Sequence, residues 1–200
     1  MIRLTKNELR DQQLKKTQLS RYLPTLQLKK ALLQAEVNQA TLEIDHLKEL
    51  EKREEQLVTE FHKLLSAPNI APLLDACKIL NVQKGKENIA GVDIPTYKSI
   101  EFAPVEYPLI STPLWWDNAL EQLRATLIAK EKIRIAKEKK HLLEKELREV
   151  SIRVNLFEKI LIPRAEQNIR KIKVFLGDQE LAAVSQAKAA KRKIYLRGGR

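Results

Sequence analysis

The sequence has little glycine, few aromatic residues and a single cysteine. Glycine occurs 5 times in 200 residues and aromatic side chains make up 5% of them, both low for a compact globular domain. Cys77 alone excludes an internal disulfide and a zinc site built from several cysteines. No run approaches the roughly 18 uninterrupted apolar residues that a membrane-spanning helix needs. Residues 1–6 hold no apolar core of the signal-peptide type, so we expect a soluble protein of a reducing compartment.

Motifs that would indicate catalysis or cofactor binding are also missing. The sequence contains neither the GxxxxGK[ST] phosphate loop nor the GxGxxG dinucleotide motif. Its three histidines, His46, His62 and His141, have no second histidine three or four residues away, and we interpret them as surface or seam residues. Cys77 is interpreted as a small buried residue rather than a nucleophile. We therefore expect no catalytic residue, no cofactor and no metal site.

Proline and charge divide the chain into two long arms and a middle segment. Six of the eight prolines lie between Pro68 and Pro113, and residues 25–67 and 114–162 contain neither proline nor glycine. Of the net charge of +11, residues 114–200 carry +10, from 21 basic and 11 acidic residues. We predict a mainly α protein, a long antiparallel two-helix coiled coil with a small middle domain that contains a β-hairpin. The predicted parts are an N-terminal coiled-coil arm (1–66), the middle domain (67–113), a C-terminal coiled-coil arm (114–176) and a basic segment (177–200) that continues the arm or is partly disordered.

Both arms carry apolar residues at alternating spacings of four and three, which is the pattern of a coiled-coil seam. The residues assigned to the seam are Leu33, Val37, Ile44, Leu47, Val58, Leu143, Leu147, Val150, Val154, Phe157 and Leu161. Each arm of about 60 residues gives roughly 90 Å of helix, and its stripe must be covered. We favour an intramolecular antiparallel hairpin with both termini at one end. A parallel homodimer is the competing arrangement.

Three positions predict interruptions of the helical arms. Pro24 is expected to kink the first arm, and Pro163 is expected to bend the second. Gly177 offers a place for the helix to pause. From the residue before Pro163 onward, the spacing of three and four continues through Ile162, Ala165, Ile169, Ile172 and Leu176.

The middle segment has a strand-like pattern. Val92 and Ile94 alternate with polar neighbours, and residues 83–86 have a turn-like composition, so we predict a β-hairpin or small sheet. Trp115 and Trp116 open the second arm, and we expect them to pack the middle domain onto it.

The C-terminal segment is strongly basic. Its six positive residues are Lys188, Lys191, Arg192, Lys193, Arg197 and Arg200. One interpretation is contact with the phosphates of a nucleic acid. Only Tyr195 offers a surface for base stacking, so we favour the second interpretation, in which the basic helix end occupies a cavity in a protein partner.

Two motifs resemble a known family. The segment RVNLFEKILIPR at 153–164 is similar to the RVNALE…IPR signature of the D subunit of V-type (vacuolar and archaeal-type) ATPases, and NIAGVDIP at 88–95 is similar to the NIAGVxVP of that family's central hairpin. Weaker similarities lie at 5–9, 28–33 and 168–172, so the resemblance spans the chain in the family's order. The residues that carry the signature are Arg153, Asn155, Glu158, Pro163, Arg164, Gly91 and Pro95. Phe157 and Lys159 depart from it, and so does Pro24 in the first arm.

The resemblance implies a non-catalytic rotor shaft. The D subunit of that family stands inside the hexamer of catalytic and non-catalytic subunits and couples ATP turnover to rotation of the membrane ring that moves protons or sodium ions. The implied partners are those subunits, the smaller F subunit and a funnel-shaped subunit that joins the shaft to the ring. The implied location is cytoplasmic, peripheral to the membrane without inserting into it, and no nucleic acid is involved.

Two other classes remain open on the sequence. One is a coiled-coil export or chaperone component of the kind that forms the stalk of the flagellar export ATPase, a class that lacks the insertion at 88–95. The other is a coiled coil that binds nucleic acid.

Overall fold

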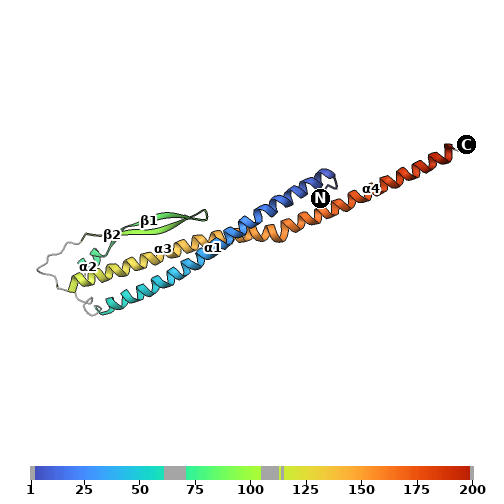
Figure 1. Ribbon diagram of the computed structural model, residues 1–200. Helices are drawn as coiled ribbons and strands as arrows, with labels where there is room; N and C mark the ends of the chain where they lie inside the picture. Colours follow the sequence, from blue (N-terminus) through green and yellow to red (C-terminus); the bar gives the residue numbers. More distant parts are fainter. Residues whose placement is uncertain (1–2, 61–70, 105–112, 114, 199–200) are drawn as a thin grey trace. The chain divides into compact units, whose positions relative to one another are not determined.

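The computed structural model describes residues 3–60, 71–104, 113 and 115–198. Its elements are α1 (Lys6–Glu60), α2 (Ala71–Ala76), β1 (Ile79–Ile89), β2 (Val92–Phe102), α3 (Trp115–Leu156), a π-helical turn η2 (Phe157–Leu161) and α4 (Ile162–Gly198). The prediction of a mainly α protein with long helices and a central β-hairpin is confirmed (Figure 1). The chain forms two compact units, Met1–Lys30 with Glu149–Arg200, and Ala31–Arg148. The predicted domain boundaries stay predictions, since the one at 66 lies outside the described residues.

In the first unit, the start of α1 runs antiparallel to α4. Lys16 Nζ lies 2.9 Å from Glu166 Oε1, and Lys6 Nζ lies 3.7 Å from Glu180 Oε1, so residue numbers rise along one helix as they fall along the other. Figure 1 shows α4 continuing beyond the start of α1. Thr5 caps α1, because its hydroxyl oxygen accepts the Glu8 N–H at 3.3 Å, the first half of a capping box.

In the second unit, α1 from Ala31 onward pairs with α3. Lys139 Nζ lies 3.1 Å from Glu43 Oε2, and Lys130 Nζ lies 3.0 Å from Glu55 Oε1, which makes this pair antiparallel as well. The apolar residues that α1 and α3 bury in this unit are Leu33, Val37, Ala40, Ile44, Trp116, Ala119, Leu120, Ala129, Ile133, Ile135, Ala136 and Leu143.

The β-hairpin turns at Ala90 and Gly91, which both have positive φ (52° and 82°), as a two-residue type I′ turn requires. The Gly91 N–H donates to Asn88 Oδ1 at 3.1 Å. The expectation of a turn at 83–86 is wrong, because these residues lie inside β1. Gly85 leaves room for a side chain of the paired strand, because a Cβ at this position would lie 2.5 Å from Thr96 Oγ1.

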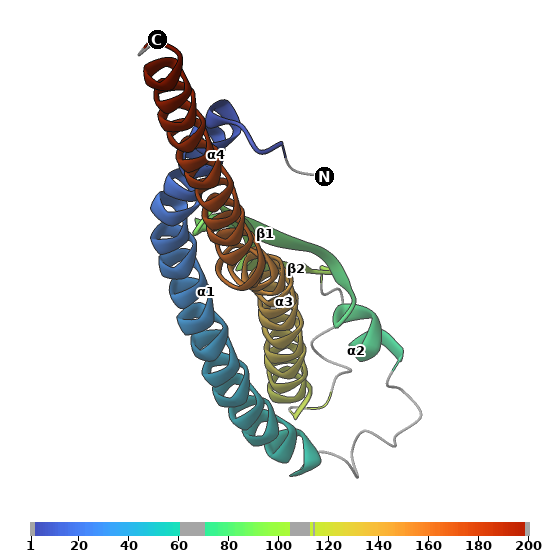
Figure 2. The same ribbon diagram turned by 90° about the vertical axis from the view of Figure 1, so that its right-hand side faces the viewer.

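The hairpin lies along α3 (Figures 1 and 2). Ile94 is fully buried, and Lys84 Nζ on β1 lies 2.6 Å from Glu138 Oε2 on α3. Lys132 Nζ of α3 lies 5.2 Å from the centre of the Tyr97 ring on β2. Charged side chains of both elements therefore connect the hairpin to the helix.

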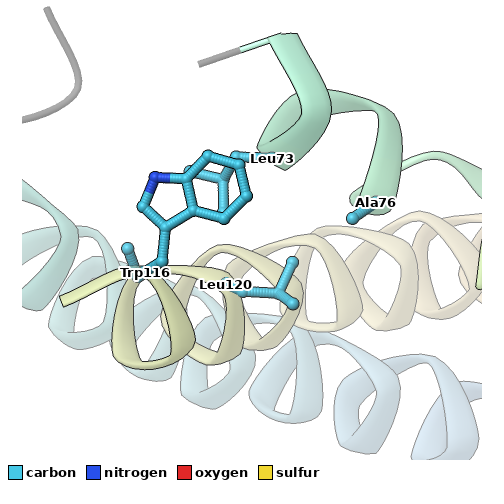
Figure 3. Packing of buried hydrophobic residues seen from close by; sticks show 5 residues of the cluster. Leu73, Ala76, Trp116 and Leu120 are labelled. Carbon is cyan, nitrogen blue, oxygen red and sulfur yellow. The ribbon is translucent and has the colours of Figure 1, made fainter. Parts of the chain in front are cut away.

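A small hydrophobic cluster joins α2 to the start of α3. Figure 3 shows Trp116 and Leu120 of α3 facing Leu73 and Ala76 of α2, and all four side chains are buried. Trp115 packs at the edge of the same cluster. The expectation that the two tryptophans pack the middle segment onto the second arm is confirmed.

The sequence predicts three interruptions of the helical arms, and one of them is wrong. Helix α4 continues through Gly177, so there is no pause at this residue. Pro24 lies inside α1, and the kink expected there stays a prediction. A π-helical turn ends at Leu161, two residues before Pro163. Proline has no N–H to donate to the carbonyl four residues earlier, and a wider turn accommodates this. After it, Ala165 and Ile172 are buried.

Candidate functional site: helical seams and an exposed basic helix

The residues assigned to the seam lie on the inner faces of the helices. Buried members are Leu33, Val37, Ile44, Leu143, Val150 and Val154. Half-buried members are Leu47, Val58, Leu147, Phe157 and Leu161, the last two within the π-helical turn. Spacing of three and four brings one side of each helix to its neighbour, which explains why these positions share a face.

The seam of the first unit also contains a polar pair. Asn168 Nδ2 donates to Gln12 Oε1 at 3.4 Å, and both residues are buried, with 9% and 8% of their surface exposed. Gln12 Nε2 in turn donates to Glu8 Oε1 at 2.8 Å. Buried amides of this kind fix the register of a helix pair, because a shifted pair leaves them without partners.

Sequence reasoning missed this pair, although a signal was present. Gln12 stands one heptad before Leu19 on the apolar row that continues to Leu26 and Leu33. A polar residue at a seam position of that row indicates a buried polar partner on the other arm.

The signature residues do not gather into one site. Arg153, Asn155, Glu158 and Arg164 are exposed on the outer side of α3, the π-helical turn and α4, and Pro163 is half-buried. Arg153 Nη2 lies 3.6 Å from Glu149 Oε2 on the same helix.

The other two signature residues belong to the hairpin. Gly91 forms its turn, and Pro95 is half-buried on β2 opposite Lys86. Counting from the two-residue turn, this pair is a non-hydrogen-bonded one, where proline removes no bond between the strands.

The C-terminal part of α4 is exposed all round. Every residue from Leu181 to Leu196 is exposed, including Lys188, Lys191, Arg192 and Lys193. The Arg197 side chain and Arg200 lie outside the described residues. Exposed apolar side chains lie on both sides of the positive ones along the helix; they are Leu181, Val184, Ile194, Tyr195 and Leu196. A helix that presents both kinds of side chain without burying either is suited to a partner with apolar and acidic surface.

The remaining candidates that the structure describes are not grouped into a metal site or a nucleophilic site. Among the described residues, no group of three His, Cys, Asp or Glu side chains is placed to hold a metal ion. His46 and His141 are exposed, and His62 lies outside the described residues. Burial raises the pKa of the Cys77 thiol above its ordinary value, while the nearby Arg124 lowers it less. A thiol whose neutral form is favoured is a poor nucleophile.

A second feature missed by sequence reasoning is Arg124 on α3. Its guanidinium donates to the Ala76 carbonyl at 2.7 and 3.2 Å and to the Ala103 carbonyl at 2.9 Å. It also lies 4.9 Å from the centre of the Phe102 ring. Nothing in the spacing of the sequence marks this arginine among the basic residues of the second arm, because its partners are backbone carbonyls.

Comparisons with known proteins identify the family of the chain. The family model for the D subunit of ATP synthase matches residues 8–192. The V-type ATP synthase D subunit of Chlamydia felis is 42% identical over 197 residues, which cover 98% of this chain and 95% of that protein. The proteins of the same name from Chlamydia trachomatis serovar L2 and Chlamydia pneumoniae are 42% and 40% identical, and cover 96% and 100% of this chain and 96% of each relative. With a match of this length and identity, the chain belongs to the family of ATP synthase D subunits.

Proposed function

We propose that this chain is the central rotor component of a V-type ATP synthase. In this role it couples ATP hydrolysis or synthesis in the hexamer of catalytic and non-catalytic subunits to rotation of a membrane ring that moves protons or sodium ions. The observation that carries the proposal is the family match over 8–192, which includes the paired helices, the hairpin and most of the exposed basic helix.

The physical features support a mechanical role. Two antiparallel helices that share buried seams resist bending and twisting better than one helix. The sequence contains no phosphate loop, so the chain contributes shape and charge rather than nucleotide chemistry. We assign the exposed end of α4 to the cavity of the hexamer, and the middle segment to the F subunit and the funnel-shaped subunit.

The proposed location is the cytoplasmic side of the membrane, in a membrane-bound complex. In the part of the chain that the structure describes, no helix has both the length and the apolar character to cross a bilayer. In this proposal the funnel-shaped subunit joins the chain to the membrane ring.

The hairpin and the exposed part of α4 each bear on one of the two alternatives. The export-stalk class lacks an insertion at 88–95, whereas β1 and β2 occupy this region here. For the nucleic-acid alternative, the exposed part of α4 presents one aromatic ring, Tyr195, among its lysines.

Reconstitution tests the proposal. The pure chain is expected to hydrolyse no ATP, to co-purify with a tagged catalytic subunit, and to change the ATPase rate of the hexamer. ATP turnover by the pure chain, or failure to associate with the hexamer at low salt, would contradict it.

The contribution of the basic helix is tested with matched charge variants. In the test variant, Gln replaces Lys188, Lys191, Arg192 and Lys193. This variant is expected to assemble less well than the parent chain, and the difference between the two is expected to grow as the salt concentration falls. The reason is that exposed charges act over longer distances at low salt than the about 8 Å of physiological salt. The control replaces four exposed positive residues of α1 by Gln, namely Arg10, Lys15, Arg21 and Lys52. Equal effects of both variants would show that only net charge matters. In complexes that do assemble, rotation observed on single molecules is expected to persist.

A further inference from the structure

Helix α4 extends past the start of α1, and its larger apolar side chains change sides there. In the paired part, Ile172 is fully buried, whereas Val174, which points to the opposite side of the helix, is 60% exposed. Lys6, the first residue of α1, lies beside Glu180. Every residue from Leu181 to Leu196 is exposed, so α4 continues beyond this point as a single helix (Figure 1).

The side of this single helix that continues the seam carries small or amide side chains. Steps of seven residues keep a position on nearly the same side of a helix. From Asn168, Ile169 and Ile172, which are buried or half-buried, such steps lead to exposed alanines and glutamines. The positions reached between 179 and 190 are Gln179, Ala182, Ala183, Gln186, Ala189 and Ala190. Alanine and glutamine offer a second helix little apolar surface to cover, so the apolar seam ends where α1 begins.

The opposite side carries the larger apolar residues and two lysines. From Val174, spacings of seven and then of three and four lead along one row, which we call the outer row. It consists of Leu181, Val184, Lys188, Lys191 and Tyr195. Between 179 and 190, Leu181 and Val184 are the only large apolar residues, and they are 69% and 52% exposed. Exposed apolar residues at this spacing are typical of a helix face that a partner covers.

The outer row has an order along the helix that describes its partner. Leu181 and Val184 come first, and Lys188 follows seven residues, or roughly 10 Å, after Leu181. Lys191 Nζ lies 5.9 Å from the centre of the Tyr195 ring, so the positive charge stays within the row. A complementary surface therefore presents apolar side chains first and carboxylates about 10 Å further along. The phosphates of a nucleic acid would match only the lysines, which favours a protein.

We propose that the outer row is the surface through which α4 docks onto the hexamer, and that the seam side of the single helix contributes less to binding. The hexamer is then expected to meet the outer row with apolar side chains followed by acidic ones. This inference rests on the proposed function, because the hexamer is the partner proposed there. It adds which side of the helix is bound.

The first experiment compares two exposed apolar residues of similar size. Leu181→Ala changes the outer row, whereas Ile194→Ala changes a residue that is 71% exposed and points about 100° away from Tyr195. The dissociation constant of the full chain is measured with the purified hexamer of catalytic and non-catalytic subunits. Leu181→Ala is expected to raise it at least about fivefold, and Ile194→Ala less than about twofold.

The second experiment compares two lysines that lie two residues apart. Lys191 belongs to the outer row, whereas Lys193 continues the seam row through Gln179 and Gln186. Lys191→Gln and Lys193→Gln remove the same charge, so the long-range attraction to the hexamer falls equally in both. Lys191→Gln is expected to raise the dissociation constant about threefold more than Lys193→Gln, because it also removes a contact. If Lys191→Gln weakens binding while Leu181→Ala does not, the partner recognises charge alone, as nucleic acid does, and the proposal is overturned.

The outcomes separate this inference from the proposed function. Because all four residues are exposed, each variant is expected to melt at the temperature of the parent chain, so that changes in binding report on the interface. Failure of the parent chain to associate with the hexamer would overturn both proposals. If the parent chain associates and the two members of either pair lose affinity equally, only the assignment of the outer row is overturned.

Discussion

At the scale of single residues, Arg124 holds three segments of the second unit together. Its guanidinium satisfies the carbonyl at the end of α2 and the carbonyl just after β2, and its charge faces the Phe102 ring. A planar group with several N–H donors can reach two backbone carbonyls at once, which the single ammonium of lysine does less well.

Arg124→Met keeps the apolar stem but removes these donors. We expect the free energy of unfolding to fall by about 2–3 kcal/mol, since two partly buried carbonyls lose a charged partner. Arg124→Lys, the control, is expected to lose less. Urea denaturation followed by circular dichroism measures both. If Arg124→Met proved as stable as the parent chain, the contacts of Arg124 would be energetically neutral.

Val154 tests the assignment of the seam. It is 3% exposed, and Val154→Asp would bury a carboxylate without a partner, which we expect to cost at least about 3 kcal/mol. Ile152 lies two residues away and is 60% exposed, so Ile152→Asp serves as the control with little expected effect. Thermal melting by circular dichroism distinguishes the two. Similar melting points would mean that both residues face water.

At the scale of elements, replacing glycine by alanine is expected to have opposite effects on stability at two positions with different surroundings. A Cβ at Gly177 in α4 meets no heavy atom within 4 Å, whereas a Cβ at Gly85 in β1 would clash with Thr96 Oγ1 at 2.5 Å. Gly177→Ala is therefore expected to stabilise α4 by about 0.5–1 kcal/mol, as alanine does in a helix interior.

Gly85→Ala is the matched control and is expected to destabilise the hairpin by about 1–2 kcal/mol. Hydrogen exchange of the two elements is the measurement, with slower exchange in α4 and faster exchange in β1. Combining Gly85→Ala with Thr96→Ala is expected to restore the hairpin, and a failure of that rescue would show that the clash is not the cause.

The elements that the sequence predicts well are those set by local pattern. Spacing of three and four marks the buried Val37 and Val154 because helix geometry alone places them on one face. Composition places the hairpin turn at 83–86 instead of at Gly91, since a glycine that gives space to a paired strand looks in the sequence like a glycine that forms a turn. The π-helical turn escapes prediction, because Pro163 marks a disturbance of the helix but not the form that the disturbance takes.

At the scale of the whole molecule, the ion pairs favour a monomer. In each unit a residue of α1 pairs with the opposite charge on the later helix, as Lys16 does with Glu166 and Glu43 with Lys139. In a parallel dimer, Lys16 would face Lys16, and like charges would meet along the seam.

We therefore expect a monomer by light scattering. A short reagent is expected to link Lys16→Cys to Glu166→Cys, and Glu43→Cys to Lys139→Cys, within one molecule, in a Cys77→Ala background. Linked products with twice the mass of the chain would instead indicate the parallel dimer and remove the geometric basis of the proposed rotor.

The pairing of Gln12 with Asn168 also has a consequence for biosynthesis. The two residues are 156 positions apart, so the start of α1 leaves the ribosome long before its partner exists. At roughly 5–20 residues per second, this interval lasts on the order of 10–30 s. During it, residues 6–30 have an apolar stripe and no helix of their own chain to cover it. The second unit, whose members lie closer in sequence, completes first, and the growing chain meets its greatest risk of wrong association just before synthesis ends.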